Sequence, residues 1–182
     1  PAVFNQKTSF KYEVIVTDSS STDGTIDIIR KFKKKHSNLR FDIIETSEFG
    51  HGKTRNRAAH MAKGEIIVFL SHDAIPASNM WLHEMVKPFE FSDKIAGVLG
   101  KQIPRPNCMP LLKNEIRAVF GSFGPDIATG LYYKDSFMGS DAIFNAVSFY
   151  SDVNSATRRS LLVGEIPYHD VPYAEDYMFG KD

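Results

Sequence analysis

Short apolar runs, each followed by small polar residues, recur through the first half of the chain. Continuous runs of this kind predict short strands that are buried on both faces, here at residues 12–17, 41–45 and 66–70. Apolar positions at helical spacing predict a helix after each of the first two strands, ending near residue 36 and spanning residues 54–63. Strands alternating with helices predict a doubly wound α/β fold with a parallel sheet and a ligand site at the polar strand ends.

The second half has a weaker pattern. It predicts helices at residues 78–89 and 111–120, a strand at 95–103, and a long loop at 121–141. The stretch from residue 142 onward is interpreted as a strand followed by a short helix that begins near Ser155. No repeat or low-complexity linker interrupts the chain, so we expect a single domain over residues 1–182.

Composition narrows the classes of partner. The chain has 182 residues, 42% of them hydrophobic, which is enough for one globular core. The 22 basic and 22 acidic residues cancel, so nucleic acid is not an expected partner. Cys108 is the sole cysteine, which favours a reducing, cytoplasmic location. The sequence has no apolar run long enough for a membrane span, so we expect any membrane contact to be peripheral.

Asp18 lies at the end of the first predicted strand, beside the polar turn "SSSTDGT". A carboxylate there can accept a hydrogen bond from a nucleobase N–H, and the turn offers backbone donors. The alternative for this stretch is structural, with Thr22 and Asp23 capping the helix that follows. We favour a binding role for Asp18 and a capping role for Asp23.

The segment "FGHGKTRN" joins the second strand to the second helix. Its end matches the phosphate-loop pattern G-x-x-x-x-G-K-[ST], but Ser47 stands where that pattern needs its first glycine. A phosphate-loop nucleoside triphosphatase, with ATP or GTP binding that depends on Lys53, is therefore the less favoured alternative. His51 and Arg55 still give the helix a cationic N-terminal turn suited to a diphosphate.

Acidic residues at two places are candidates for chemistry. Asp73, in "FLSHDAIP" after the third strand, is placed to hold a Mg²⁺ or Mn²⁺ ion that bridges a diphosphate, because such ions can use one carboxylate together with phosphate and water. The alternative is that His72 and Asp73 are only polar residues at a strand end. Glu175 and Asp176, in "YAEDYMF", start a predicted helix, where acids are common without catalysis, and one of them can serve as a general base only if it faces the cleft.

Taken in order, the stretches "VIVTDSSSTDGT", "FGHGKTRNRAAHMAKGEIIVFLSHDAIP", "FYSDVNSATRRSLL" and "YAEDY" resemble family 2 glycosyltransferases of the GT-A fold. Bacterial rhamnosyltransferases are the most similar members, and the resemblance extends from residue 12 onward. Two departures from the family pattern are the absence of a first strand before residue 4 and an end just after Asp176. We therefore expect a partial GT-A domain.

The resemblance implies a nucleotide-sugar donor, a glycan or lipid-linked glycan acceptor, and a divalent cation. It assigns donor binding to Asp18, His51, Gly52, Arg55 and Asp73, the metal to Asp73, the catalytic base to Asp176, and the acceptor side to Asn154, Arg158 and Glu175. The implied reaction is inverting transfer of L-rhamnose from dTDP-rhamnose to a bacterial surface glycan, at the cytoplasmic side of the membrane. Transfer of another sugar and a non-catalytic nucleotide-binding domain remain as alternatives.

Overall fold

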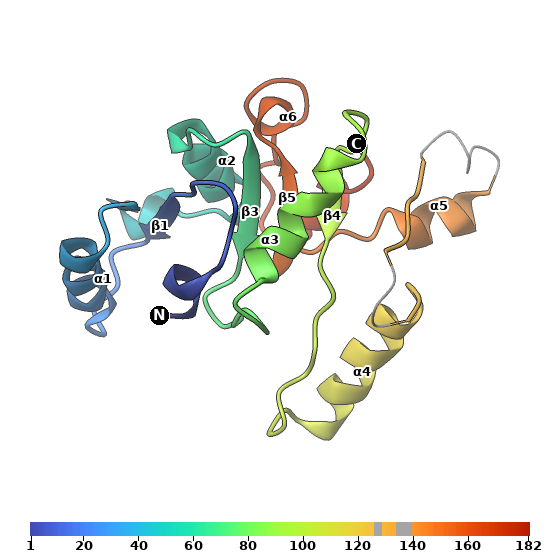
Figure 1. Cartoon of the computed structure of the whole chain (residues 1–182), viewed down its shortest axis with the longest axis horizontal. Coiled ribbons are helices and arrows are strands. Elements are labelled where there is room, and N and C mark those ends of the chain that lie inside the picture. The colour runs from blue at the N-terminus through green and yellow to red at the C-terminus, as the bar shows by residue number, and fades with distance from the viewer. Residues whose placement is uncertain (126–128, 134–139) are drawn as a thin grey trace.

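The computed structural model describes residues 1–125, 129–133 and 140–182, and its strands form two separate sheets (Figure 1). The strands are β1 (Val14–Asp18), β2 (Leu39–Ile43), β3 (Ile66–Leu70), β4 (Gly97–Leu99) and β5 (Asn154–Arg158). The α-helices are α1 (Thr25–Lys35), α2 (His51–Met61), α3 (Trp81–Val86), α4 (Pro110–Gly121), α5 (Asp141–Val147), α6 (Arg159–Val163) and α7 (Glu175–Phe179). The predicted α/β class is confirmed.

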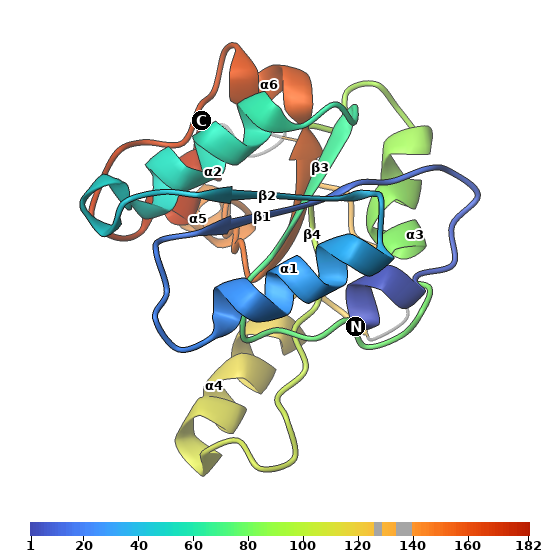
Figure 2. The same cartoon turned by 90° about the vertical axis from the view of Figure 1, so that its left-hand side faces the viewer.

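The first sheet is the parallel pair β1–β2, in register from Val14 opposite Leu39 to Asp18 opposite Ile43. α1 and α2 lie on opposite sides of this pair (Figure 2). The crossover helix α1 buries Ile29 and ends in three lysines that lie at the negative end of the helix dipole. The two strands therefore end at the same edge, as a β-α-β unit requires.

The second sheet has the order β3–β5–β4, with β5 antiparallel to both neighbours. Side chains of β3 alternate between its two faces, as expected for a strand. Ile67 and Phe69 pack against the buried cluster of Ala59, Leu162, Tyr168 and Phe179. Ile66 and Val68 pack on the other face, against the cluster of Met85, Phe89 and Ala156. One strand thus joins both halves of the core.

The facing edges of the two sheets have no strand between them in the described part of the chain. β1 pairs only with β2, and β3 pairs only with β5. The apolar residues of β1 and β3 are consequently half-buried, although their sequence predicts burial on both faces. α2 lies beside this opening and contributes to the walls of the cavity described below.

The elements in the second half of the chain differ in part from those predicted. The strand predicted from residue 142 is wrong at its start, where residues 141–147 form helix α5. The short helix predicted to begin near Ser155 begins at Arg159 as α6, because residues 154–158 form β5. The segment "NSATR" is polar and small, and it becomes a strand because β3 and β4 both pair with it. The predicted loop 121–141 includes residues 126–128 and 134–139, which lie outside the described residues. α4 projects away from the sheets (Figure 1).

Across the described residues, the helices are too short or too polar to cross a membrane.

Candidate active site

A cavity of about 170 Å³ opens between β1 and β3, at the carboxyl ends of these strands. Its lining includes Ile15, Thr17, Arg55, Phe69, Ser71 and Asp152. The Thr17 hydroxyl is buried and has no hydrogen-bond partner among the described residues. A polar group left in this way can hold a ligand or another backbone segment, because its burial is otherwise costly.

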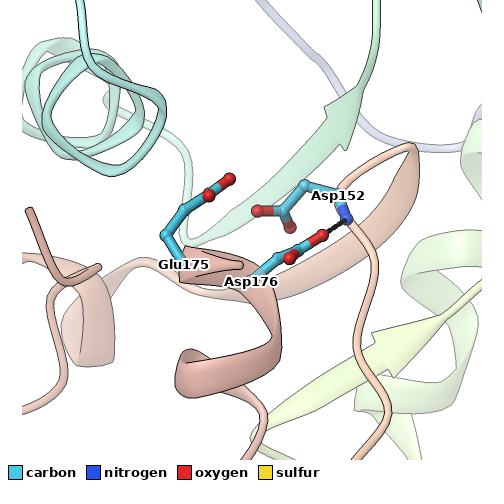
Figure 3. A group of neighbouring side chains, drawn as sticks. All are labelled: Asp152, Glu175 and Asp176. Atoms are coloured by element: carbon cyan, nitrogen blue, oxygen red, sulfur yellow. Dashed lines mark hydrogen bonds between the residues drawn. The ribbon is translucent and has the colours of Figure 1, made fainter. Parts of the chain in front are cut away.

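Three acids meet beside this cavity: Asp152, from the turn before β5, with Glu175 and Asp176 from the start of α7. Their carboxylate oxygens lie within 4.8 Å of one another, and the side chains converge in Figure 3. Ala174, immediately before α7, has a φ of 63°, in the left-handed region that a non-glycine residue rarely adopts. Backbone strain of this kind concentrates at functional sites, and here it is at the entry to the acidic helix turn.

Arg55 supplies the opposing charge. Its Nε atom lies 3.1 Å from Asp152 Oδ2, and its guanidinium also pairs with Glu175. The contact with Asp152 is an ion pair without an aligned hydrogen bond, because Oδ2 has no hydrogen-bond partner among the described residues. The guanidinium also lies over the Tyr168 ring, 5.6 Å from its centroid. The "TRN" motif therefore brings a cation to two of the three acids.

The carboxylate of Asp152 has no exposed surface. Its Oδ1 atom accepts hydrogen bonds from Ser155 Oγ at 2.6 Å and from the Tyr168 hydroxyl at 2.8 Å. Burial raises the pKa of Asp152, and the charge of Arg55 opposes this effect only in part. Burial also raises the pKa of Tyr168, so its hydroxyl is a stable hydrogen-bond donor.

Asp176 is half-buried, and backbone groups orient its carboxylate. Oδ1 accepts a hydrogen bond from Tyr177 N–H at 2.9 Å, and Oδ2 accepts a longer one from Asp152 N–H at 3.4 Å. Carboxylate oxygens have further lone pairs, so Asp176 can still accept a proton from a substrate hydroxyl. Glu175, by contrast, is buried and paired with Arg55.

The acidic cluster is a poor fit for a divalent cation, because Arg55 already lies against Asp152 and Glu175. Asp73 fits better. It is exposed, and its Oδ1 accepts a hydrogen bond from Ser71 Oγ at 2.6 Å, which is the main cause of its lowered pKa. The neighbouring Arg105 donates to the Asp73 carbonyl oxygen. An ionised, accessible carboxylate suits a cation that takes its remaining ligands from phosphate and water.

The other predicted donor residues lie at the end of β1 and in the first turn of α2. Asp18 is buried at the end of β1, and its Oδ1 accepts the Ser21 N–H at 2.7 Å. His51, the first residue of α2, is exposed with its ring against Phe49. Gly52 is buried, and a Cβ atom there would lie 2.1 Å from the His169 carbonyl oxygen. This close packing gives the glycine at position 52 a structural reason.

The residues predicted on the acceptor side are not gathered in one place. The side-chain amide of Asn154 accepts from Trp81 Nε1 and donates to the Lys101 carbonyl. Arg158 is at the opposite end of β5, where its guanidinium donates to the carbonyls of Ile95 and Ser92. These contacts give both side chains a structural role, and their part in acceptor binding stays a prediction.

Sequence reasoning did not single out Asp152, Tyr168 or Arg105. Asp152 and Tyr168 meet Arg55 only through the fold, and nothing in their local sequence indicates that contact. Arg105 lies in a proline-rich break with no periodicity. The one available signal was the position of Asp152 in a polar turn before an expected element.

Comparison with known proteins gives this arrangement a family. The model of the family described as "Glycosyl transferase family 2" matches residues 2–163, and the chain belongs to that family. The O-antigen chain rhamnosyltransferase WbaN of Salmonella anatum is 32% identical over 177 residues, which are 95% of this chain and 51% of that protein. The rhamnosyltransferase RfbN of Salmonella typhimurium is 36% identical over 108 residues, 58% of this chain and 32% of that protein. The chain thus spans at most about half the length of these relatives.

Solved structures show the same fold. The mannosyltransferase PcManGT from Pyrobaculum calidifontis, in complex with GDP-Man and Mn²⁺, matches with a TM-score of 0.64 and 21% identity over 98% of this chain and 44% of that one. TarS 1–349 from S. aureus, in complex with UDP, matches with a TM-score of 0.65 and 22% identity over 98% and 48% of the two chains. The GT-A fold expected from the sequence is confirmed.

Proposed function

We propose that this chain is the nucleotide-sugar-binding domain of an inverting glycosyltransferase that transfers L-rhamnose from dTDP-rhamnose to a hydroxyl group of a bacterial surface glycan. The observation that carries the proposal is Asp176, a half-buried carboxylate held by backbone N–H groups beside a cavity in a family 2 chain. The similarity to two O-antigen rhamnosyltransferases supports the choice of sugar.

In this proposal Asp176 accepts the proton of the acceptor hydroxyl as its oxygen attacks the anomeric carbon. The bond between that carbon and the β-phosphate oxygen breaks, dTDP leaves on the opposite side, and the configuration inverts. Arg55 keeps Asp152 and Glu175 compensated, so that Asp176 is the acid of the cluster left to take the proton. General-base assistance of this kind contributes about 10²- to 10⁴-fold in rate.

We assign Asp73 as the protein ligand of a divalent cation, Mg²⁺ or Mn²⁺, because its carboxylate is ionised and accessible. When bound, such a cation neutralises charge on the diphosphate leaving group. We propose that the nucleotide-sugar donor contacts Asp18, His51 and Arg55. If the acceptor glycan is lipid-linked, the domain works at the cytoplasmic face of the membrane by peripheral contact.

The test is Asp176→Asn in the full chain. We expect release of dTDP from dTDP-rhamnose, with or without a glycan acceptor, to fall at least about 100-fold. Binding of dTDP should be retained, because the variant leaves the donor side unchanged. Asp27→Asn is the matched control, since Asp27 is an exposed residue of α1 whose ion pair is with Arg30 of the same helix.

Near-normal turnover in Asp176→Asn would remove Asp176 from the role of base. A parent chain that binds dTDP and never turns over its sugar donor would favour the non-catalytic nucleotide-binding alternative. Turnover of a different nucleotide sugar in preference to dTDP-rhamnose would correct the donor and leave the base assignment in place.

A further inference from the structure

We propose that Asp152 is a positioning residue for this reaction, which holds Arg55 through its carboxylate and Asp176 through its backbone N–H. The inference rests on the proposed function. It adds to the site a residue that touches neither donor nor acceptor in the mechanism above. Its role is to fix the position of the Arg55 guanidinium relative to the Asp176 carboxylate.

Asp152 contacts both Arg55 and Asp176. Oδ2 lies 3.1 Å from Arg55 Nε, while the backbone N–H reaches Asp176 Oδ2 at 3.4 Å. The remaining oxygen, Oδ1, accepts from Ser155 and Tyr168. These bonds leave the Asp152 carboxylate little freedom to rotate. Arg55 and Asp176 are therefore both held by one fixed residue.

Asp152 lies in a turn that is anchored to the end of β3. The Asn154 N–H closes this turn by donating to the Ser151 carbonyl at 3.2 Å. The next residue, Val153, accepts from Ser71 N–H at 3.3 Å, which ties the turn to the end of β3. Ser71 in turn donates to Asp73. The turn of Asp152 therefore connects the proposed cation side of the cavity with the acidic helix α7.

Burial of the charged Asp152 carboxylate is energetically unfavourable. Asp152 has no exposed side-chain surface, and burial raises its pKa despite Arg55. Buried ion pairs are commonly neutral or unfavourable for stability compared with uncharged replacements. A buried carboxylate that is kept at such a cost is better explained by the geometry it imposes than by a contribution to folding.

The experiment compares Asp152→Asn, Arg55→Gln and the double variant in the full chain. Asn keeps the shape and the backbone N–H but removes the charge that faces Arg55. We expect kcat for dTDP release from dTDP-rhamnose to fall at least about 10-fold in each single variant, with KM for the donor changed less than about 3-fold in Asp152→Asn. If Asp152 acts through Arg55, the double variant loses no more than the worse single variant.

Asp27→Asn is the matched control, because it makes the same Asp-to-Asn change in an exposed ion pair, with Arg30 on α1. We expect it to retain kcat within about 3-fold. A folded Asp152→Asn with parental kcat, or losses in the double variant that multiply, would overturn the proposal. A lower melting temperature together with parental kcat would assign Asp152 a purely structural role.

A second readout separates this inference from the proposed function. In heteronuclear NOE measurements by NMR, we expect the Arg55 Nε–H group of the parent to be ordered, because ion pairs with Asp152 and Glu175 hold the guanidinium, and to gain mobility in Asp152→Asn. A parent chain that transfers no sugar, with this gain observed, would count against the glycosyltransferase proposal and support the positioning of Arg55. An unchanged Arg55 signal in the variant would overturn the positioning itself.

Discussion

Replacing Gly52 by alanine tests why the "HGKT" segment needs its glycine. A Cβ atom at this position would lie 2.1 Å from the His169 carbonyl oxygen, and real Cβ contacts are essentially never shorter than 3.0 Å. The loop must therefore move by about 1 Å, and the atom in the way is backbone rather than a flexible side chain. Overpacking of this kind typically costs about 1–3 kcal/mol.

The control for this variant is Gly121→Ala, at the end of α4. A Cβ atom there meets nothing within 4 Å, and both replacements remove a glycine from a helix. The difference between the two variants thus isolates the close approach. In a domain of this size 1 kcal/mol shifts the melting temperature by about 2–4 °C, so Gly52→Ala should melt about 2–12 °C below Gly121→Ala.

Thermal unfolding followed by circular dichroism measures this difference. Equal melting temperatures for Gly52→Ala and Gly121→Ala would refute the structural explanation of Gly52. In that case a binding role for the glycine, at a diphosphate, would become the better explanation. Because the displaced loop leads to α7, we also expect Gly52→Ala to lower turnover.

Two further predictions concern charge. Asp73→Ala should abolish the rise in melting temperature that Mn²⁺ and dTDP produce together, and a rise equal to that of the parent would remove Asp73 from the cation site. For Asp152, burial raises the pKa above its ordinary 3.8, so the folded protein binds this proton more tightly than the unfolded chain and its stability contribution falls as pH rises through that range. The melting temperature of Asp152→Asn, relative to the parent, should therefore rise as the pH increases above 3.8, and a pH-independent difference would contradict the assignment.

β1, α1 and β3 were predictable because the information that specifies each of them is local. The apolar runs of β1 and β3 and the helical spacing of α1 are each sufficient to specify an element. β5 was missed because "NSATR" has no apolar run of its own. Its strand conformation comes from hydrogen bonds with β3 and β4, which lie far away in the sequence.

For the site, sequence reasoning found single residues at strand and helix ends but not their pairing. Arg55 and the acids of α7 were both noted, but the sequence did not indicate that the fold pairs Arg55 with Asp152 and Glu175. That pairing is a long-range event that no motif spacing encodes. The residue that joins them, Asp152, is a single acid in a polar turn and gives no periodic signal.

The open edges of β1 and β3 have a consequence for the behaviour of the chain in solution. Among the described residues, no strand pairs with these edges of β1 and β3, and neither strand contains a proline or lysine to discourage pairing. Such edges are templates on which a strand from another molecule can add. Purified by itself, this chain is therefore expected to self-associate through edge-to-edge pairing as its concentration rises, and covering that opening is what would keep it monomeric.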